Sequence, residues 1–157
     1  MVEVESLVKR LVNIYGKKRE SLLPVLQGII EQERTLTEES LRIVAQELDL
    51  SAAQVYGTAT FYSFLDTEPR GEFVIRVCKS ITCSMKGKNQ MIKTIEETLK
   101  MKLGETTKDK KFTLLETNCL GWCHKAPAML INDDNHTELN EEKVIEIINS
   151  YSKKGTY

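Results

Sequence analysis

Four cysteines constrain this chain more than any other feature, because they are all the cysteines it has and they fall in two close pairs. Cys78 and Cys83 form a C-x4-C pair, and after a gap of 35 residues Cys119 and Cys123 form a C-x3-C pair. An apolar, strand-like run ends just before each pair. The pattern predicts two short loops that together present four thiolates to one metal site.

The composition indicates a folded protein that does not need cross-links. Its 157 residues are enough for one domain or two small ones, and 41% are hydrophobic, so a core can form without disulfide bonds. The net charge of −1 argues against a general nucleic-acid-binding protein. The first residues resemble no signal peptide and no stretch is apolar enough to span a membrane, so we expect a cytoplasmic protein with reduced thiols.

The N-terminal part is predicted to be all-helical. Apolar residues recur at helical spacing over 3–15 and 20–33, which predicts two helices. Thr37 is a predicted N-cap for a third helix, and Ser51 opens a capping-box pattern for a fourth. We find no catalytic chemistry in this part of the chain.

A break in the pattern divides the chain. Pro69 and Gly71 end the helical periodicity and mark a turn or linker. We therefore predict two domains, a small helical bundle over 1–66 and an α/β domain over 72–157, which together give the fold class α+β.

The second half begins with a strand–helix–strand pattern. Strands are predicted at 73–77 and 112–116, with a helix at 86–101 between them. In such a βαβ unit the two strands are parallel, and parallel strands end at the same edge of a sheet. Since each cysteine pair comes directly after one of these strands, the fold should bring all four thiols together.

The rest of the chain is predicted to complete this domain. A third strand is expected at 128–131, a hairpin turn at 132–135 and a short fourth strand at 136–139. Asn140 is a predicted N-cap for the last helix, and the end of the chain, 153–157, is expected to be frayed.

The spacing alone leaves three kinds of site open. We favour a [2Fe–2S] cluster, because a two-iron cluster takes four thiolates and is held on both irons by two separated pairs. Structural zinc also takes four thiolates with similar spacings, and a disulfide or thiol site is the third alternative. No C-x-x-C motif of the thioredoxin type is present. Gly121 would allow the second loop to wrap closely around a metal centre, or would serve an ordinary turn.

Three stretches together resemble a known family. They are Val-Tyr-Gly-Thr-Ala-Thr-Phe-Tyr at 55–62, the two cysteine pairs, and Cys-Leu-Gly-Trp-Cys-His-Lys-Ala-Pro-Ala-Met at 119–129. They resemble the thioredoxin-like [2Fe–2S] ferredoxins, over nearly the whole chain. This family includes the small two-iron subunit of the NADH-oxidising arm of complex I. It also includes matching subunits of NAD(P)-linked iron-only hydrogenases and formate dehydrogenases.

The resemblance implies a helical N-terminal domain, a thioredoxin-like C-terminal domain and a [2Fe–2S] cluster as the cofactor. It carries the cluster ligands over to all four cysteines of this chain, Cys78, Cys83, Cys119 and Cys123. Trp122 departs from the pattern, because family members commonly have a small residue there. Its bulk would change the cover of the cluster or a contact with a partner.

The implied function is one-electron transfer in a multisubunit NAD(P)H-linked oxidoreductase. We expect this oxidoreductase to be a soluble hydrogenase complex, and one form of this expectation is an electron-bifurcating hydrogenase. Complex I and formate dehydrogenase are the alternatives. The partners would be a flavin- and NAD(P)-binding subunit and a hydrogenase or other catalytic subunit. The chain itself has no Gly-rich phosphate loop, so we expect an electron carrier without its own substrate site. A zinc-stabilised interaction module is the alternative of another class.

Other residues near the two pairs receive structural interpretations. His124 and His136 are not expected to be ligands, because four cysteines already fill the site. The stretch 57–62 is interpreted as packing. Four lysines in or beside the loops are expected to be solvated, with attraction of an acidic partner as the alternative: Lys79, Lys86, Lys88 and Lys125.

Overall fold

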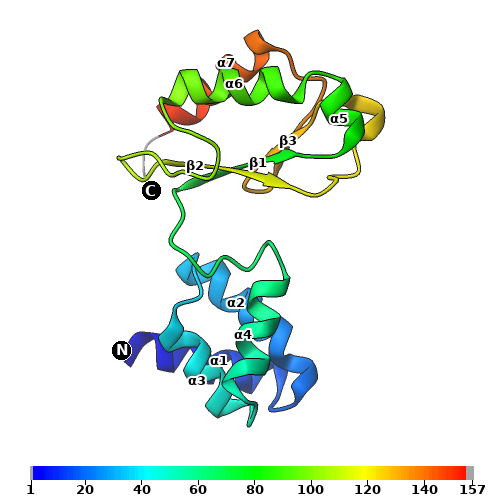
Figure 1. Cartoon of the computed structure of the whole chain (residues 1–157). Helices are drawn as coiled ribbons and strands as arrows, with labels where there is room; N and C mark the ends of the chain where they lie inside the picture. The colour runs from blue at the N-terminus through cyan, green and yellow to red at the C-terminus, as the bar shows by residue number, and fades with distance from the viewer. Residues whose placement is uncertain (1, 155–157) are drawn as a thin grey trace. The chain divides into compact units, whose positions relative to one another are not determined.

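A computed structural model describes residues 2–154 and divides the chain into two compact units, one up to Pro69 and one from Arg70 onward (Figure 1). The predicted domain boundaries, 1–66 and 72–157, remain a proposal, because contacts do not test independent folding. The end expected to be frayed, 153–157, is helical at Lys153, the last residue of α7, and lies outside the described residues from 155 on. None of the helices between residues 2 and 154 has the length and apolar character needed to span a membrane.

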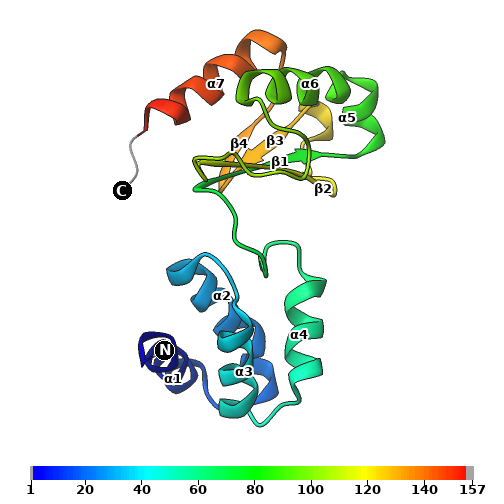
Figure 2. The ribbon, with the colours of Figure 1, turned by 60° about the vertical axis from the view of Figure 1, so that its left-hand side comes forward.

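The first unit is helical, as predicted, and its helices surround one core (Figure 2). A short 3-10 helix, η1, precedes the second long helix, and Pro24 falls in the first turn of that helix, where its missing N–H costs no hydrogen bond. The elements are α1 (Val2–Tyr15), η1 (Arg19–Ser21), α2 (Leu22–Glu33), α3 (Glu38–Glu47) and α4 (Ala52–Phe61).

Side chains at the helix starts explain where α3 and α4 begin. The Thr37 hydroxyl accepts a hydrogen bond from the Ser40 N–H at 3.1 Å. Ser51 and Gln54 form a reciprocal capping box. Each of these bonds satisfies backbone donors that a helix start leaves without partners, so both predicted caps are confirmed.

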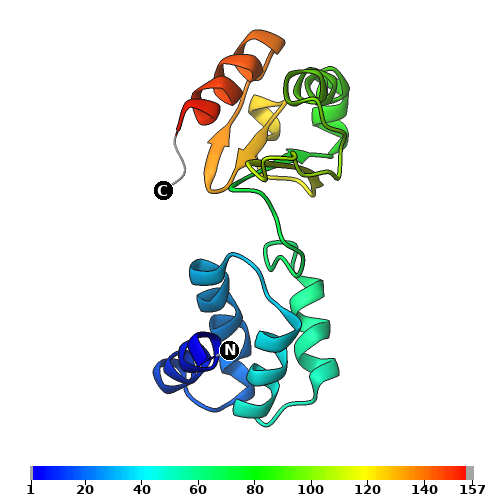
Figure 3. The same cartoon turned by 90° about the vertical axis from the view of Figure 1, so that its left-hand side faces the viewer.

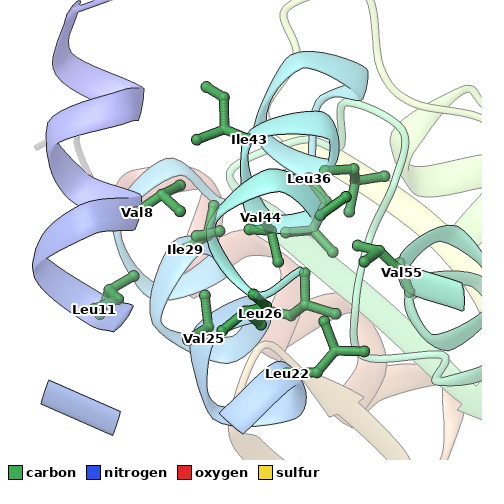
Figure 4. Packing of buried hydrophobic residues seen from close by; sticks show 14 of the residues in the cluster. Val8, Leu11, Leu22, Val25, Leu26, Ile29, Leu36, Ile43, Val44 and Val55 are labelled. Atoms are coloured by element: carbon green, nitrogen blue, oxygen red, sulfur yellow. The ribbon is translucent and has the colours of Figure 1, made fainter. Parts of the chain in front are cut away.

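The core of this unit is built by apolar side chains from all four long helices (Figure 4). Val8 and Leu11 of α1 contact apolar side chains of α2, and Val55 of α4 belongs to the same core. The fully or almost fully buried members include Val8, Val12, Val25, Leu26, Ile29, Leu36, Val44 and Val55. Burial of this many aliphatic side chains is what stabilises helices of ten to fourteen residues.

The second unit is a four-stranded mixed sheet in the order β2-β1-β3-β4. β1 pairs in parallel with β2 and antiparallel with β3, which pairs antiparallel with β4. The helices α6 and α7 lie side by side on one face of the sheet (Figures 1 and 3). The elements are β1 (Phe73–Cys78), α5 (Ile81–Met85), α6 (Lys88–Leu99), β2 (Phe112–Thr117), η2 (Cys123–Lys125), β3 (Met129–Ile131), β4 (Asp134–His136) and α7 (Glu141–Lys153).

The core of this unit lies between the sheet and the two long helices. Alternate residues of β1, such as Ile75 and Val77, point into it together with Leu114 of β2, Ile95 of α6 and Ile148 of α7, and all five are inaccessible to solvent. The parallel pairing runs from Phe73 opposite Phe112 to Cys78 opposite Thr117. The predicted βαβ pairing is therefore confirmed, and the two strands end at the same edge.

The helix predicted over 86–101 is confirmed as α6, but a second, short helix before it was not predicted. Gly87 takes φ +98 and separates this helix, α5, from α6. α5 has five residues and carries Cys83, which the sequence had placed in a loop. A helix this short shows no apolar periodicity, so the pattern could not reveal it.

The fourth strand begins two residues earlier and ends three residues earlier than predicted. β4 is Asp134–His136 instead of 136–139, since Ile131 pairs with Asp134 across a two-residue turn. Asn132 takes a left-handed conformation in that turn, with φ +51, which Asn tolerates better than most residues. Leu139 comes after the strand and is buried in the core.

Candidate metal centre

The four thiols lie on two segments at the ends of the parallel strands. Cys78 is the last residue of β1 and Cys83 lies within α5, whereas Cys119 lies after β2 in an irregular loop and Cys123 begins η2. All four are free thiols. In Figure 1 the α5 segment and the loop after β2 meet at one end of the sheet.

Backbone hydrogen bonds tie these segments together. The Lys79 N–H donates to the Thr117 carbonyl at 2.9 Å, and the Cys78 N–H donates to the Ala128 carbonyl at 3.2 Å. The loop that carries the second cysteine pair therefore leaves and returns beside the first cysteine. The sheet itself fixes the approach of two pairs that are far apart in the sequence.

Contacts between the thiols confirm that the pairs are close. Cys119 Sγ and Cys123 Sγ are 3.3 Å apart. Cys78 interacts with Cys83 and with the backbone N–H of Leu120 in the second loop. The charges of Cys78 and Cys83 in turn act on Cys123. Among the described residues, 2–154, no three His, Cys, Asp or Glu surround one point closely enough to hold a single ion, and the thiols stand as two pairs.

The two pairs differ in exposure. Cys78 and Cys83 are buried, with 2% and 1% of their surface accessible, whereas Cys119 and Cys123 are exposed. The inner pair (Cys78 and Cys83) is enclosed by the end of β1 and by α5. The outer pair (Cys119 and Cys123) faces solvent.

The thiols of the inner pair have different acidities. Burial acts to raise the pKa of Cys78, but hydrogen bonds with the Ser80 hydroxyl and with the N–H groups of Ser80 and Leu120 lower it to about 7. Burial raises the pKa of Cys83, against hydrogen bonds from Ser80 and the Ala128 backbone. One thiol of this pair is thus prepared to lose its proton near neutral pH, which a metal ligand requires.

The outer pair has one backbone donor and a glycine at positive φ. The Gly121 N–H donates to Cys119 Sγ at 3.4 Å. Gly121 takes φ +86, and no atom lies within 4 Å of where a Cβ would stand. The loop therefore needs glycine for its conformation and not for space. The pKa of Cys123 is raised, first by its hydrogen bond with Cys119 and further by burial and by the other three thiols.

This donor set fits a two-iron cluster. Thiolates are the ligands that such clusters take, two on each iron, and backbone N–H groups directed at the sulfurs are typical of these sites. The two histidines are engaged elsewhere: the His124 ring lies 5.8 Å from the Trp122 ring, and His136 Nε2 is 3.5 Å from the Tyr151 hydroxyl. Within residues 2–154 neither histidine hydrogen-bonds to a cysteine.

Both cysteine-bearing segments also carry exposed apolar side chains. Ile81 and Met85 of α5 are 77% and 81% accessible, and Trp122, between the outer cysteines, is 37% accessible. Lys88 is not simply solvated as expected, because its Nζ lies 2.8 Å from Glu116 Oε1 with only 13% of its side chain accessible.

One contact of the site was not predicted from the sequence. Ser80 contacts Cys78, with the thiol and hydroxyl 3.3 Å apart, although a serine in that position is expected to be a helix cap.

The packing interpretation of 57–62 is largely wrong. Within this stretch Ala59 alone is fully buried, Tyr62 is partly packed and Phe61 is 77% accessible.

Comparison with known proteins places the chain in a defined group. The model of the thioredoxin-like [2Fe–2S] ferredoxin family matches residues 8–152. One NADH-quinone oxidoreductase subunit from Aquifex aeolicus is 35% identical over 96% of this chain and 94% of its own length. The subunit with the same name from Rickettsia typhi is 39% identical over 85% of this chain and 79% of its own.

A solved structure shares the fold. The crystal structure of an NAD+-reducing [NiFe]-hydrogenase in the air-oxidized state superposes with a TM-score of 0.73 at 21% identity. The match covers 83% of this chain but only 22% of the hydrogenase chain, so this chain spans about a fifth of that protein.

Proposed function

The chain belongs to the thioredoxin-like [2Fe–2S] ferredoxin family, whose cofactor is a [2Fe–2S] cluster, and from this premise we propose that it is a one-electron carrier within a larger NAD(P)H-linked oxidoreductase. When bound, the cluster would supply a single-electron redox couple. We propose that its ligands are the four cysteines of the inner and outer pairs, Cys78, Cys83, Cys119 and Cys123.

One observation carries this proposal. The loop of the outer pair is tied at both ends, through Thr117 and Ala128, to the backbone of Cys78 and Lys79. The fold thereby holds four free thiols as two adjacent pairs, which is the arrangement that a cluster with two irons needs. Thioredoxin-like redox chemistry between two close cysteines would not need the second pair.

The surface suggests where electrons enter or leave. The outer pair is exposed and lies in the loop that carries Trp122, with the apolar side chains Ile81 and Met85 exposed on α5. Electron transfer requires close approach, and apolar surface favours contact with a partner. We therefore assign the outer pair to the side that faces the electron donor or acceptor, and the inner pair to anchoring.

The partner is proposed to hold the flavin and the NAD(P) site. The relatives from Aquifex aeolicus and Rickettsia typhi are named as subunits of NADH-quinone oxidoreductase, which favours a complex of that type. A soluble, electron-bifurcating hydrogenase or a formate dehydrogenase remains the finer proposal from the sequence, and the likeness to the [NiFe]-hydrogenase shows the fold alone. The chain itself has no Gly-rich phosphate loop.

Anoxic affinity purification from the native cells, with mass spectrometry of the proteins that co-purify, tests the assignment. We expect a flavin-binding subunit and a catalytic subunit whose identity names the terminal reaction. Recovery of this chain alone with iron present would contradict a stable complex and favour a free ferredoxin. Recovery with stoichiometric zinc and no iron would contradict electron transfer altogether and favour a structural module.

A further inference from the structure

Ser80 occupies the N-cap position of α5 but does not cap it. Its backbone is extended, as at an N-cap, yet its side chain accepts no hydrogen bond from the helix. The side chains of Thr37, Ser51 and Asn140 at the starts of α3, α4 and α7 all accept such a bond. The Ser80 hydroxyl is therefore available for another contact.

That contact is with the inner pair. Ser80 Oγ lies 3.3 Å from Cys78 Sγ. Both cysteines are almost inaccessible to solvent. Water does not compete strongly for a sulfur that is buried to this degree, so a protein hydroxyl has a large effect there.

The direction of this hydrogen bond has to reverse when the cysteines bind metal. In the free thiol, the Cys78 S–H group donates a hydrogen bond to Ser80 Oγ. A metal-bound thiolate has no proton, so the same contact persists only if the Ser80 hydroxyl donates to the sulfur. A serine hydroxyl can play both roles without moving.

We propose that Ser80 is a positioning residue that tunes the reduction potential, with its hydroxyl donating a hydrogen bond to the thiolate sulfur of the inner pair. The inference rests on the proposed function, because it requires a cluster held by Cys78 and Cys83. Reduction adds one negative charge to the site and strengthens every hydrogen bond that a sulfur accepts. The hydroxyl therefore stabilises the reduced state and raises the potential.

The test is an anoxic redox titration of the full-length protein with its cluster, monitored by EPR. We expect Ser80→Ala to shift the one-electron equilibrium toward the oxidised state by about tenfold, which is 59 mV for a one-electron couple. Ser80→Thr keeps the hydroxyl and should stay near the wild-type value. Ser84→Ala is the matched control, because it removes a serine hydroxyl from the same short helix. Among the described residues, that hydroxyl has no hydrogen bond to a cysteine.

The outcomes separate this inference from the proposed function. A wild-type protein without a two-iron EPR signal would contradict the proposed function itself. A wild-type signal with an unchanged potential in Ser80→Ala would overturn only the role of Ser80. Ser80→Gly repeats the deletion with a residue that helix starts tolerate. Loss of the cluster from both variants, with the unit still folded, would also overturn tuning and assign Ser80 to cluster assembly.

Discussion

The inner and outer cysteine pairs lie where two parallel strands end at one edge of the sheet, yet they have opposite environments. The inner pair is 1–2% accessible, because α5 begins at Ile81 and encloses Cys83. The outer pair lies after β2 in an irregular loop and is exposed. Two pairs of similar spacing in the sequence thus have different exposure in the structure, because a helix comes after β1 and an irregular loop comes after β2.

The loss of a ligand should have the greatest effect, and its size should depend on the pair. Cys83→Ser should abolish the cluster, because a shorter ligand on the packed helix α5 cannot move to reach iron. Cys123→Ser should keep some iron with an altered EPR spectrum, since the outer loop can shift. Iron analysis and EPR of both variants, reconstituted side by side, measure this.

The first unit provides the control for those variants. Its core contains no cysteine and is built from its own helices, so helical circular dichroism should be retained in both. Cluster retention in Cys83→Ser together with complete loss in Cys123→Ser would reverse the comparison. It would mean that the outer pair is the anchor.

Alkylation of the metal-free protein should separate the pairs by rate. Cys119 and Cys123 should react at least about tenfold faster than Cys78, because the thiolate must also be accessible to the reagent. The pKa of Cys123 is raised, so its labelling should keep increasing as the pH rises beyond its ordinary pKa. Cys78, with a pKa of about 7, is mostly thiolate at pH 8 and should still react slowly.

Timed labelling and then peptide mass spectrometry give these rates residue by residue. If Cys78 were labelled first at pH 8, the acidity of the thiol and not its burial would control the labelling rate. The inner pair would then be more open than the structure indicates. The protein with its cluster should resist labelling at all four positions, since coordinated thiolates are unavailable to the reagent.

A glycine substitution beside each pair separates the two environments further. Gly121→Ala and Gly87→Ala both place a side chain at positive φ with no atom within 4 Å, so each should cost about 1 kcal/mol of backbone strain. Of these two glycines, Gly121 is the one whose N–H group donates a hydrogen bond to a cysteine sulfur. Cluster release to a chelator should therefore accelerate in Gly121→Ala, while both variants lose similar thermal stability.

Gly87→Ala is the matched control for that experiment. It strains the junction between α5 and α6 without touching the outer pair. Equal acceleration of cluster release in both variants would show that general destabilisation, and not the N–H bond to Cys119, is responsible.

A smaller change is expected from the cover of the outer pair. Trp122→Ala removes a side chain that is 37% accessible and packs against the His124 ring. We expect the rate of cluster loss in air to increase. The increase should be well below the ~10-fold effect that is typical of losing an outer hydrogen-bond partner of a metal ligand. Ile81→Ala beside the inner pair should change nothing, because Ile81 is 77% accessible and leaves Cys83 enclosed. Equal air sensitivity of Trp122→Ala and wild type would remove Trp122 from the cover.

The sequence predicted the edge at which the thiols meet, because the apolar, strand-like runs at 73–77 and 112–116 flank a helical segment and such units are parallel. It did not predict that Cys83 lies on a helix, since five residues show no periodicity. It also did not reveal which pair is buried. Burial depends on tertiary packing that pairs of similar spacing do not encode, and the contact of Ser80 with Cys78 depends on the same packing.

Metal analysis with EPR of the anoxically purified, full-length protein is the most direct test of cluster binding by the four cysteines. We expect about two irons per chain and an S = 1/2 signal on reduction with dithionite, as for a [2Fe–2S] cluster with four thiolate ligands. The cells used must be able to assemble such clusters. A colourless protein with stoichiometric zinc, no iron and no signal would contradict a role in electron transfer.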